Sequence, residues 1–140
     1  MLNMNKRKDS KEIILSSACL LLSIANADEN IDKAELKIID DIIKDFFNLN
    51  EYESEDIIKE AKHDLKKSTD YFSYGSVLNQ YFSLTDKIDF ISCIFEVAYS
   101  DGEYHYMEEH MIKKIAHMLH IENKDLVNVK MDIKRLFNLD

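Results

Sequence analysis

The chain carries one pattern twice, and this internal duplication constrains its fold more than any other feature of the sequence. An apolar stretch, an acidic turn and a second apolar stretch occur in each half of the chain, with a constant offset of 73 positions, as between Asp28 and Asp101. Self-similarity over such a length is typical of a repeated structural unit whose copies bury their apolar faces against each other. The matched positions include Leu21 with Ile94, Leu22 with Phe95, Ala25 with Ala98, Glu35 with Glu108, Ile39 with Ile112, Ile42 with Ile115 and Phe46 with Leu119.

Each copy of the unit is predicted to contain two helices. Its first segment, residues 10–27 in one copy and 85–100 in the other, is apolar on nearly every side, as helices in the middle of a domain are. We therefore expect these two helices to pack together as the core. The second segment has apolar residues at the spacing of one helix face, which predicts an amphipathic helix with a buried stripe. The stripe contains Ile38, Ile39, Ile42, Ile43, Phe46 and Phe47 in one copy, and Met107, Met111, Ile112, Ile115, Met118 and Leu119 in the other.

The segments outside the duplication also have helical patterns. Asn50 and Glu53 have the spacing of a capping box, which predicts the start of a helix over 51–67. The aromatic-rich stretch 71–82 is either a short helix or an irregular cover over the core, and a last helix is expected over 123–137.

Length and composition complete the prediction of the fold class. The 140 residues are enough for one domain, and the chain has no proline and only two glycines, which disfavours the many tight turns of a strand-rich domain. The sequence thus predicts an all-α compact bundle of six or seven helices with an internal pseudo-two-fold duplication. Residues 10–140 would form this single domain, preceded by a flexible basic tail over 1–9.

The net charge and the cysteine content limit the cellular compartment and the classes of partner that we expect. The net charge of −9 repels phosphate backbones, so nucleic-acid binding is disfavoured, whereas cations and basic partners fit. Cys19 and Cys93 lie in apolar stretches, which is typical of buried thiols in a reducing compartment. The basic start and the apolar run after it resemble a secretion signal, but the same run recurs in mid-chain. No stretch predicts a transmembrane segment, and we expect a cytoplasmic protein.

The two acidic turns share the order Asp, two residues, an apolar residue, three residues, Glu. Calcium takes several oxygen ligands, often including a bidentate carboxylate. We therefore predict that a divalent cation, with Ca²⁺ as the leading candidate, binds at each turn or at one site shared by both turns. The predicted ligands are Asp28, Asp32 and Glu35 in the first turn, and Asp101, Glu103 and Glu108 in the second.

Two comparisons limit this prediction. If Glu35 is placed at the last position of an EF-hand loop, the first position falls on Ile24, and the equivalent residue in the second copy is Val97, so the turns are not EF-hands. Asp32 and Glu35 also have capping-box spacing, and acids near a helix N-terminus are favoured by the helix dipole without any ligand. Capping does not require the upstream Asp28, however, so metal binding and capping both stay open.

At these residues the sequence resembles the TerB-like (tellurite resistance) family, whose members carry an Ala-Asp-Gly turn followed by an apolar residue and a Glu in each half. The resemblance extends over about residues 12–136 and departs from the pattern at Glu29, where Gly is usual, and at Ser100, where Ala is usual. It implies an all-α fold of about seven helices and clustered acids that bind a divalent metal, Ca²⁺ in particular. It also implies a place in bacterial stress or tellurite-resistance systems.

Other chemistry is weakly represented. The five histidines occur without a zinc-binding spacing or paired cysteines, so at most His105 is expected to assist the acidic turn. A di-iron bundle needs Glu-x-x-His twice, and Glu60 with His63 provides it once. Because no nucleophile motif or phosphate-binding glycine loop is present, we expect a protein that is not an enzyme and has no catalytic residues.

The leading hypothesis is a metal-responsive binding module in which a divalent cation ties the two halves together. The alternative is a structural or protein-interaction domain whose acids are helix caps and whose contact surface is the aromatic stretch 71–82. A metal-dependent hydrolase is the third hypothesis. We expect other proteins as partners and leave homodimerisation open.

Overall fold

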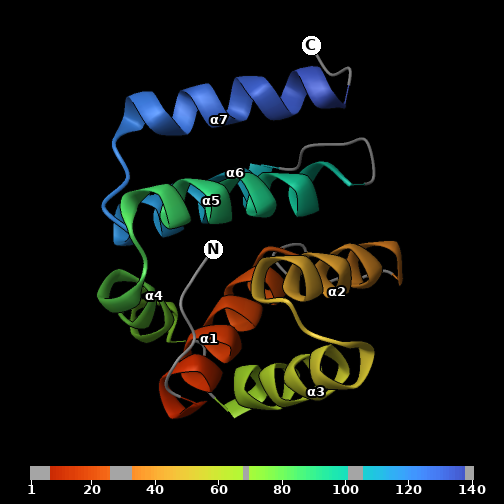
Figure 1. Cartoon of the computed structure of the whole chain (residues 1–140). Coiled ribbons are helices and arrows are strands. Elements are labelled where there is room, and N and C mark those ends of the chain that lie inside the picture. Colours follow the sequence, from red (N-terminus) through yellow and green to blue (C-terminus); the bar gives the residue numbers. More distant parts are fainter. Residues whose placement is uncertain (1–6, 26–32, 68–69, 101–105, 138–140) are drawn as a thin grey trace.

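A computed structural model describes residues 7–25, 33–67, 70–100 and 106–137, and these residues form seven helices (Figure 1). This confirms the predicted all-α fold. The aromatic stretch is a regular helix, and α1 begins at Arg7, three residues before its predicted start. The helices are α1 (Arg7–Ala25), α2 (Lys33–Phe47), α3 (Glu51–Lys67), α4 (Tyr71–Tyr81), α5 (Leu84–Tyr99), α6 (Tyr106–Met118) and α7 (Asn123–Leu136).

Helix α1 lies at the centre of the fold. It contacts α2, α3, α4, α5 and α6, and all residues from Ile13 to Ala25 are buried except Leu15. The buried serines on this helix satisfy their hydroxyls locally, since Ser17 Oγ donates to the Ile13 carbonyl at 2.8 Å and Ser23 Oγ donates to the Cys19 carbonyl at 2.7 Å. The contact between α1 and α5 confirms that the first helices of the two units pack together.

Helix α5 lies nearer the surface than α1 does. It contacts α1, α2, α6 and α7, and it buries most of its apolar residues, but Cys93 and Glu96 are only half-buried. A reciprocal capping box starts the helix: Asp86 N–H donates to Ser83 Oγ, and Ser83 N–H donates to the Asp86 carboxylate, both at 3.1 Å. Figure 1 shows α7 and α3 at opposite edges of the molecule, with the duplicated helices between them.

Helices α2 and α6 show the duplication most clearly. Their buried residues lie in register from Glu35 to Ile43, with the predicted offset of 73. Both helices end through a residue with positive φ, Asn48 and His120, and through a bond from the next residue back to the last turn (Leu49 N–H to Lys44 O and Ile121 N–H to Ala116 O, both 3.0 Å). The offset at this end is 72, so the structure matches Leu119 with Phe47 rather than with Phe46.

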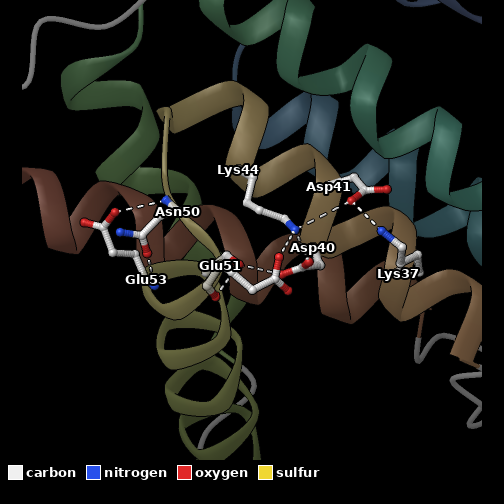
Figure 2. Close-up of polar contacts among 8 residues, drawn as sticks. Lys37, Asp40, Asp41, Lys44, Asn50, Glu51 and Glu53 are labelled. Atoms are coloured by element: carbon white, nitrogen blue, oxygen red, sulfur yellow. Dashed lines mark hydrogen bonds and ion pairs between the residues drawn. The ribbon is translucent and has the colours of Figure 1, made fainter.

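Helix α3 is fixed to α2 by polar contacts (Figure 2). The predicted capping box is present, because Glu53 N–H donates to Asn50 Oδ1 at 2.9 Å and Asn50 N–H donates to Glu53 Oε1 at 3.0 Å. Close by, Lys44 Nζ lies 2.8 Å from Asp40 Oδ2 and 2.6 Å from Glu51 Oε2. We call Asp40, Asp41, Lys44, Glu51 and Ser54 the Lys44 cluster.

Helix α4 packs against α1 and α6, and α7 packs against α5. Gly75 of α4 allows a close approach to α6, since a Cβ at this position would lie 3.3 Å from Met118 Cβ. Asn79 Nδ2 donates to the Met118 carbonyl at 2.6 Å and so satisfies an acceptor at the end of α6. Helix α7 is joined to α6 by an ion pair of 2.8 Å between Lys130 Nζ and Glu109 Oε1.

Candidate functional site

Two buried carboxylates mark the candidate site. Glu35 is the third residue of α2 and Glu108 is the third residue of α6, and they are 7% and 3% exposed. Within the described part of the chain they are the only acidic residues that are buried. They are also the two glutamates that the duplication pairs, so the same unusual burial occurs at the same place in both units.

The helix face that carries each glutamate explains why it is buried. Glu35 lies one turn before Ile39, and Glu108 lies one turn before Ile112, and both isoleucines are fully buried. The glutamates thus extend the apolar stripes that hold α2 and α6 against the core. A buried carboxylate is costly unless it is hydrogen-bonded, paired or bound to a cation, and neither carboxylate is without a partner.

The other four predicted ligands, Asp28, Asp32, Asp101 and Glu103, lie outside the described residues. The same is true of His105, so the predicted grouping of six carboxylates stays a prediction. Among the side chains that the structure does describe, no three His, Cys, Asp or Glu residues are grouped as a metal site would require. The described histidines, His63, His110, His117 and His120, are all exposed.

Helix α4, the candidate contact surface of the alternative hypothesis, directs most of its aromatic residues inward. Tyr71, Tyr74 and Tyr81 are half-buried, and Phe82 is buried. Phe72 differs, with 74% of its surface exposed. The stretch is therefore a short helix, which is one of the two arrangements expected for it, and most of its aromatic residues pack against the core.

The two cysteines are free, and their surroundings disfavour the thiolate. Burial raises the pKa of the Cys19 thiol to about 11, and burial together with nearby Glu96, Asp89 and Asp45 raises the pKa of the Cys93 thiol to about 12. Since the thiolate is the nucleophile and the metal ligand, neither cysteine is prepared for either role.

The Lys44 cluster is an electrostatic feature that the sequence analysis missed. Although burial opposes the effect, hydrogen bonds from Lys44 and Ser54 hold the pKa of Asp40 below its ordinary value of 3.8. Hydrogen bonds to Asp40 and Glu51 raise the pKa of Lys44 in turn. The spacing of Asp40 and Lys44 on one helix face was the available signal, and the contribution of Glu51 depends on how α3 turns back onto α2.

Membrane crossing and similarity to known proteins complete the description. No helix in the described ranges is sufficiently long and apolar to cross a membrane. A family model described as tellurite resistance protein TerB matches residues 15–131, which covers both duplicated units and most of α7. Neither a curated protein nor a solved structure gives a significant match to the chain.

Proposed function

Because the chain belongs to the TerB family, we propose that it is a non-enzymatic module that binds a divalent cation of the Ca²⁺ type through the acidic turns before α2 and α6. In this proposal the cation joins the two units, and the module acts in a cytoplasmic bacterial stress or tellurite-resistance system. The observation that carries the proposal is the matched burial of Glu35 and Glu108.

The oxygen chemistry of these side chains fits a hard cation. Calcium prefers carboxylate and carbonyl oxygens, and a carboxylate that is already withdrawn from water loses less hydration when the ion arrives. Glu35 and Glu108 would supply the ligands from the helices, and Asp28, Asp32, Asp101 and Glu103 would supply those from the turns. The cation contributes positive charge that compensates the buried acids; the chain holds and orients the oxygens.

Calorimetric titration with Ca²⁺, Mg²⁺ and Zn²⁺, combined with thermal unfolding, tests the proposal. A cation that binds only the folded state stabilises it by about 2.7 kcal/mol when its concentration is 100 times the dissociation constant. We expect Ca²⁺ to raise the melting temperature of the wild type, and we expect the double variant Glu35→Gln with Glu108→Gln to lose this rise. Glu55→Gln is the matched control, because Glu55 is an exposed glutamate of α3 rather than of α2, α6 or the turns before them.

The capping alternative predicts a different result from the same variants. If the two acids only satisfy helix ends, Glu35→Gln and Glu108→Gln lower the melting temperature by the same amount with Ca²⁺ and with a chelator, and the wild type gives no heat of binding. Each of the two glutamates already has a partner in the structure, and a glutamate that is paired within the chain is what this alternative requires, so it is kept as the second candidate.

A further inference from the structure

A groove lies between α1 and α3. Figure 1 shows α3 at the edge of the molecule opposite α7. Its volume is about 1020 Å³, and its floor is formed by Ile14, Phe47, Leu49 and Ile57, which are buried or half-buried. Its walls carry charged residues, chiefly from α3. Such a groove is large enough to hold part of a helix from another chain, which makes its charge pattern informative.

The groove-lining charges of α3 are arranged so that the helix can pair with an antiparallel copy of itself. Around the midpoint between Lys59 and Glu60, each acidic residue has a basic residue or a histidine at the same distance on the other side. Two copies of α3 placed antiparallel about this midpoint would therefore bring unlike groups together. The facing pairs would be Glu53 with Lys66, Asp56 with His63, and Lys59 with Glu60.

The groove-lining charges are largely unused within the chain. Asp56, Lys59, Lys62, His63 and Lys66 form no ion pair with any residue that the structure describes. Elsewhere the lysines that face acids form such pairs, as in the Lys44 cluster. This helix thus presents charges that have partners only if another molecule supplies them.

The helix dipole explains only part of the charge pattern along α3. Acids in the first turn and bases in the last turn of a helix are each favoured by about 0.3–1 kcal/mol. The dipole does not explain the apolar floor, and it does not explain Tyr52, which lies on the same helix face as Asp56 and is 80% exposed. An exposed aromatic residue beside an apolar groove is typical of a protein–protein contact.

We propose that the groove between α1 and α3 is the interface of a symmetric homodimer, in which α3 of each protomer lies antiparallel to α3 of its partner and over the partner's groove. A two-fold axis passes beside the midpoint between Lys59 and Glu60, so every contact occurs twice. The lysine stems and the ring of Tyr52 cover the apolar floor, and the charged ends of the side chains pair around it. The α1 and α3 helices of both protomers then form a four-helix arrangement.

The length of α3 is sufficient for a specific contact. Its 17 residues extend over about 25 Å. Specific interfaces begin at about 1,200 Å² of buried surface, and in this arrangement α1 of each protomer adds its surface to that of α3. The charge pairs select the antiparallel register, since a parallel arrangement would place Lys66 against Lys66 and Asp56 against Asp56. Cation binding is not needed for this contact, and the proposal is independent of the proposed function.

Charge-reversal variants test the dimer, with the mass in solution measured by sedimentation equilibrium in the presence of a chelator. At about 100 µM the wild type is expected to have twice the 16.5 kDa mass of one chain, as for complexes with micromolar dissociation constants. Glu53→Lys with Asp56→Lys places basic residues opposite the partner's Lys66 and His63, and His63→Glu with Lys66→Glu places acidic residues opposite the partner's Asp56 and Glu53. Each variant alone should dimerise at least about tenfold more weakly, because like charges then face each other.

Mixing the two variants gives the decisive measurement. In a heterodimer the two new lysines at positions 53 and 56 face the two new glutamates at positions 66 and 63, and the other pairs are those of the wild type. Dimerisation should therefore return to within a few-fold of the wild type. The matched control is Lys124→Glu with Arg135→Glu on α7, which adds acidic charge at exposed positions as the acidic α3 variant does, and it should leave the dissociation constant unchanged. Circular dichroism verifies that every variant is folded.

Three results would overturn the proposal. A wild type that stays monomeric at about 100 µM excludes a dimer of the expected strength. A mixture that stays monomeric while the wild type dimerises places the contact elsewhere, and so does an effect of the α7 control as large as that of the α3 variants.

Discussion

The two duplicated units have the same helices but different surroundings, and the contrast shows what a repeated pattern determines. Matched positions that are fully buried in both units carry apolar residues in many cases, as with Leu21 and Ile94. At other positions the units differ: buried Ser23 of α1 corresponds to half-buried Glu96 of α5. Helix α1 packs against α3 and α4 as well as against the duplicated helices, whereas the one helix outside the duplication that packs closely against α5 is α7. The duplication therefore determines which positions of α1 and α5 are apolar in both units. The helices outside the duplication determine the surroundings of the other positions.

The contacts to the third helix of each unit differ in the same way. In the first unit a single lysine, Lys44, is held by acids from α2 and α3. In the second unit a single acid, Glu109, lies 2.8 Å from Lys130 Nζ of α7 and 3.7 Å from Lys113 Nζ of α6. The sign of the central charge is reversed, and the two positions do not correspond in the repeat. The surface contacts of the two units therefore do not follow the repeated pattern of the core.

Exchanging Ser23 and Glu96, which occupy the matched position where the two units differ, should have the largest effect on the free energy of unfolding. Ser23→Glu places a carboxylate at a site that is 4% exposed. A buried charge without a partner costs about 3–5 kcal/mol, and overpacking adds about 1–3 kcal/mol, so this variant should be largely unfolded at neutral pH. The reverse change, Glu96→Ser, should alter the free energy of unfolding by no more than about 1 kcal/mol. Urea unfolding followed by circular dichroism measures both.

The pH dependence of the wild type sharpens this comparison. Burial raises the pKa of Glu96, so the favourable contribution of its neutral form is present below its unfolded pKa and is lost as the pH rises through the folded value. Glu96→Ser should remove that loss. Equal destabilisation by Ser23→Glu and Glu96→Ser would show that the two helices have equivalent surroundings, contrary to the structure.

Truncation at matched core positions should have the next largest effect on the free energy of unfolding. It tests the positions at which both units carry a buried apolar residue. Leu21→Ala and Ile94→Ala both remove fully buried side chains, and each should lower the free energy of unfolding by about 2–5 kcal/mol. Chemical unfolding with the slope held in common gives both values. A cost below about 1 kcal/mol at either position would mean that this unit is not part of one continuous core.

Most of the fold was predictable because periodicity reports which residues face the core. The apolar stretches, the offset of the duplication and the Asn50–Glu53 capping box predicted the helices to within a few residues. The sequence did not distinguish a helix from an irregular cover over 71–82, because Gly75 resembles a turn residue. In the structure it is a point of close approach to Met118.

The candidate site was predictable only in part. The pairing of Glu35 with Glu108 followed from the duplication, but their burial did not, because a glutamate on an apolar stripe can also extend its carboxylate to water. The Lys44 cluster and the groove depend on how α3 packs against α1 and α2, and contacts between helices from different units of sequence leave no local pattern. Four of the six predicted ligands lie outside the described residues, so their grouping stays a prediction.

The smallest expected effect comes from neutralising the acid that joins α6 to α7. Glu109→Gln removes one carboxylate from a partly exposed ion pair, and such pairs contribute about 0.5–1 kcal/mol. The hydrogen bond from Lys130 lowers the pKa of Glu109 below its ordinary value of 4.5. The stabilisation is therefore present above about pH 4.5 and is lost as the pH falls through the lower folded value. The melting temperatures of wild type and variant should differ at pH 7 and converge as the pH falls below the folded pKa of Glu109. In the first unit Asp40→Asn should show the same convergence, shifted to lower pH because the ordinary pKa of Asp40 is 3.8. A difference that stays constant from pH 7 to pH 3 would show that packing, rather than charge, joins these helices.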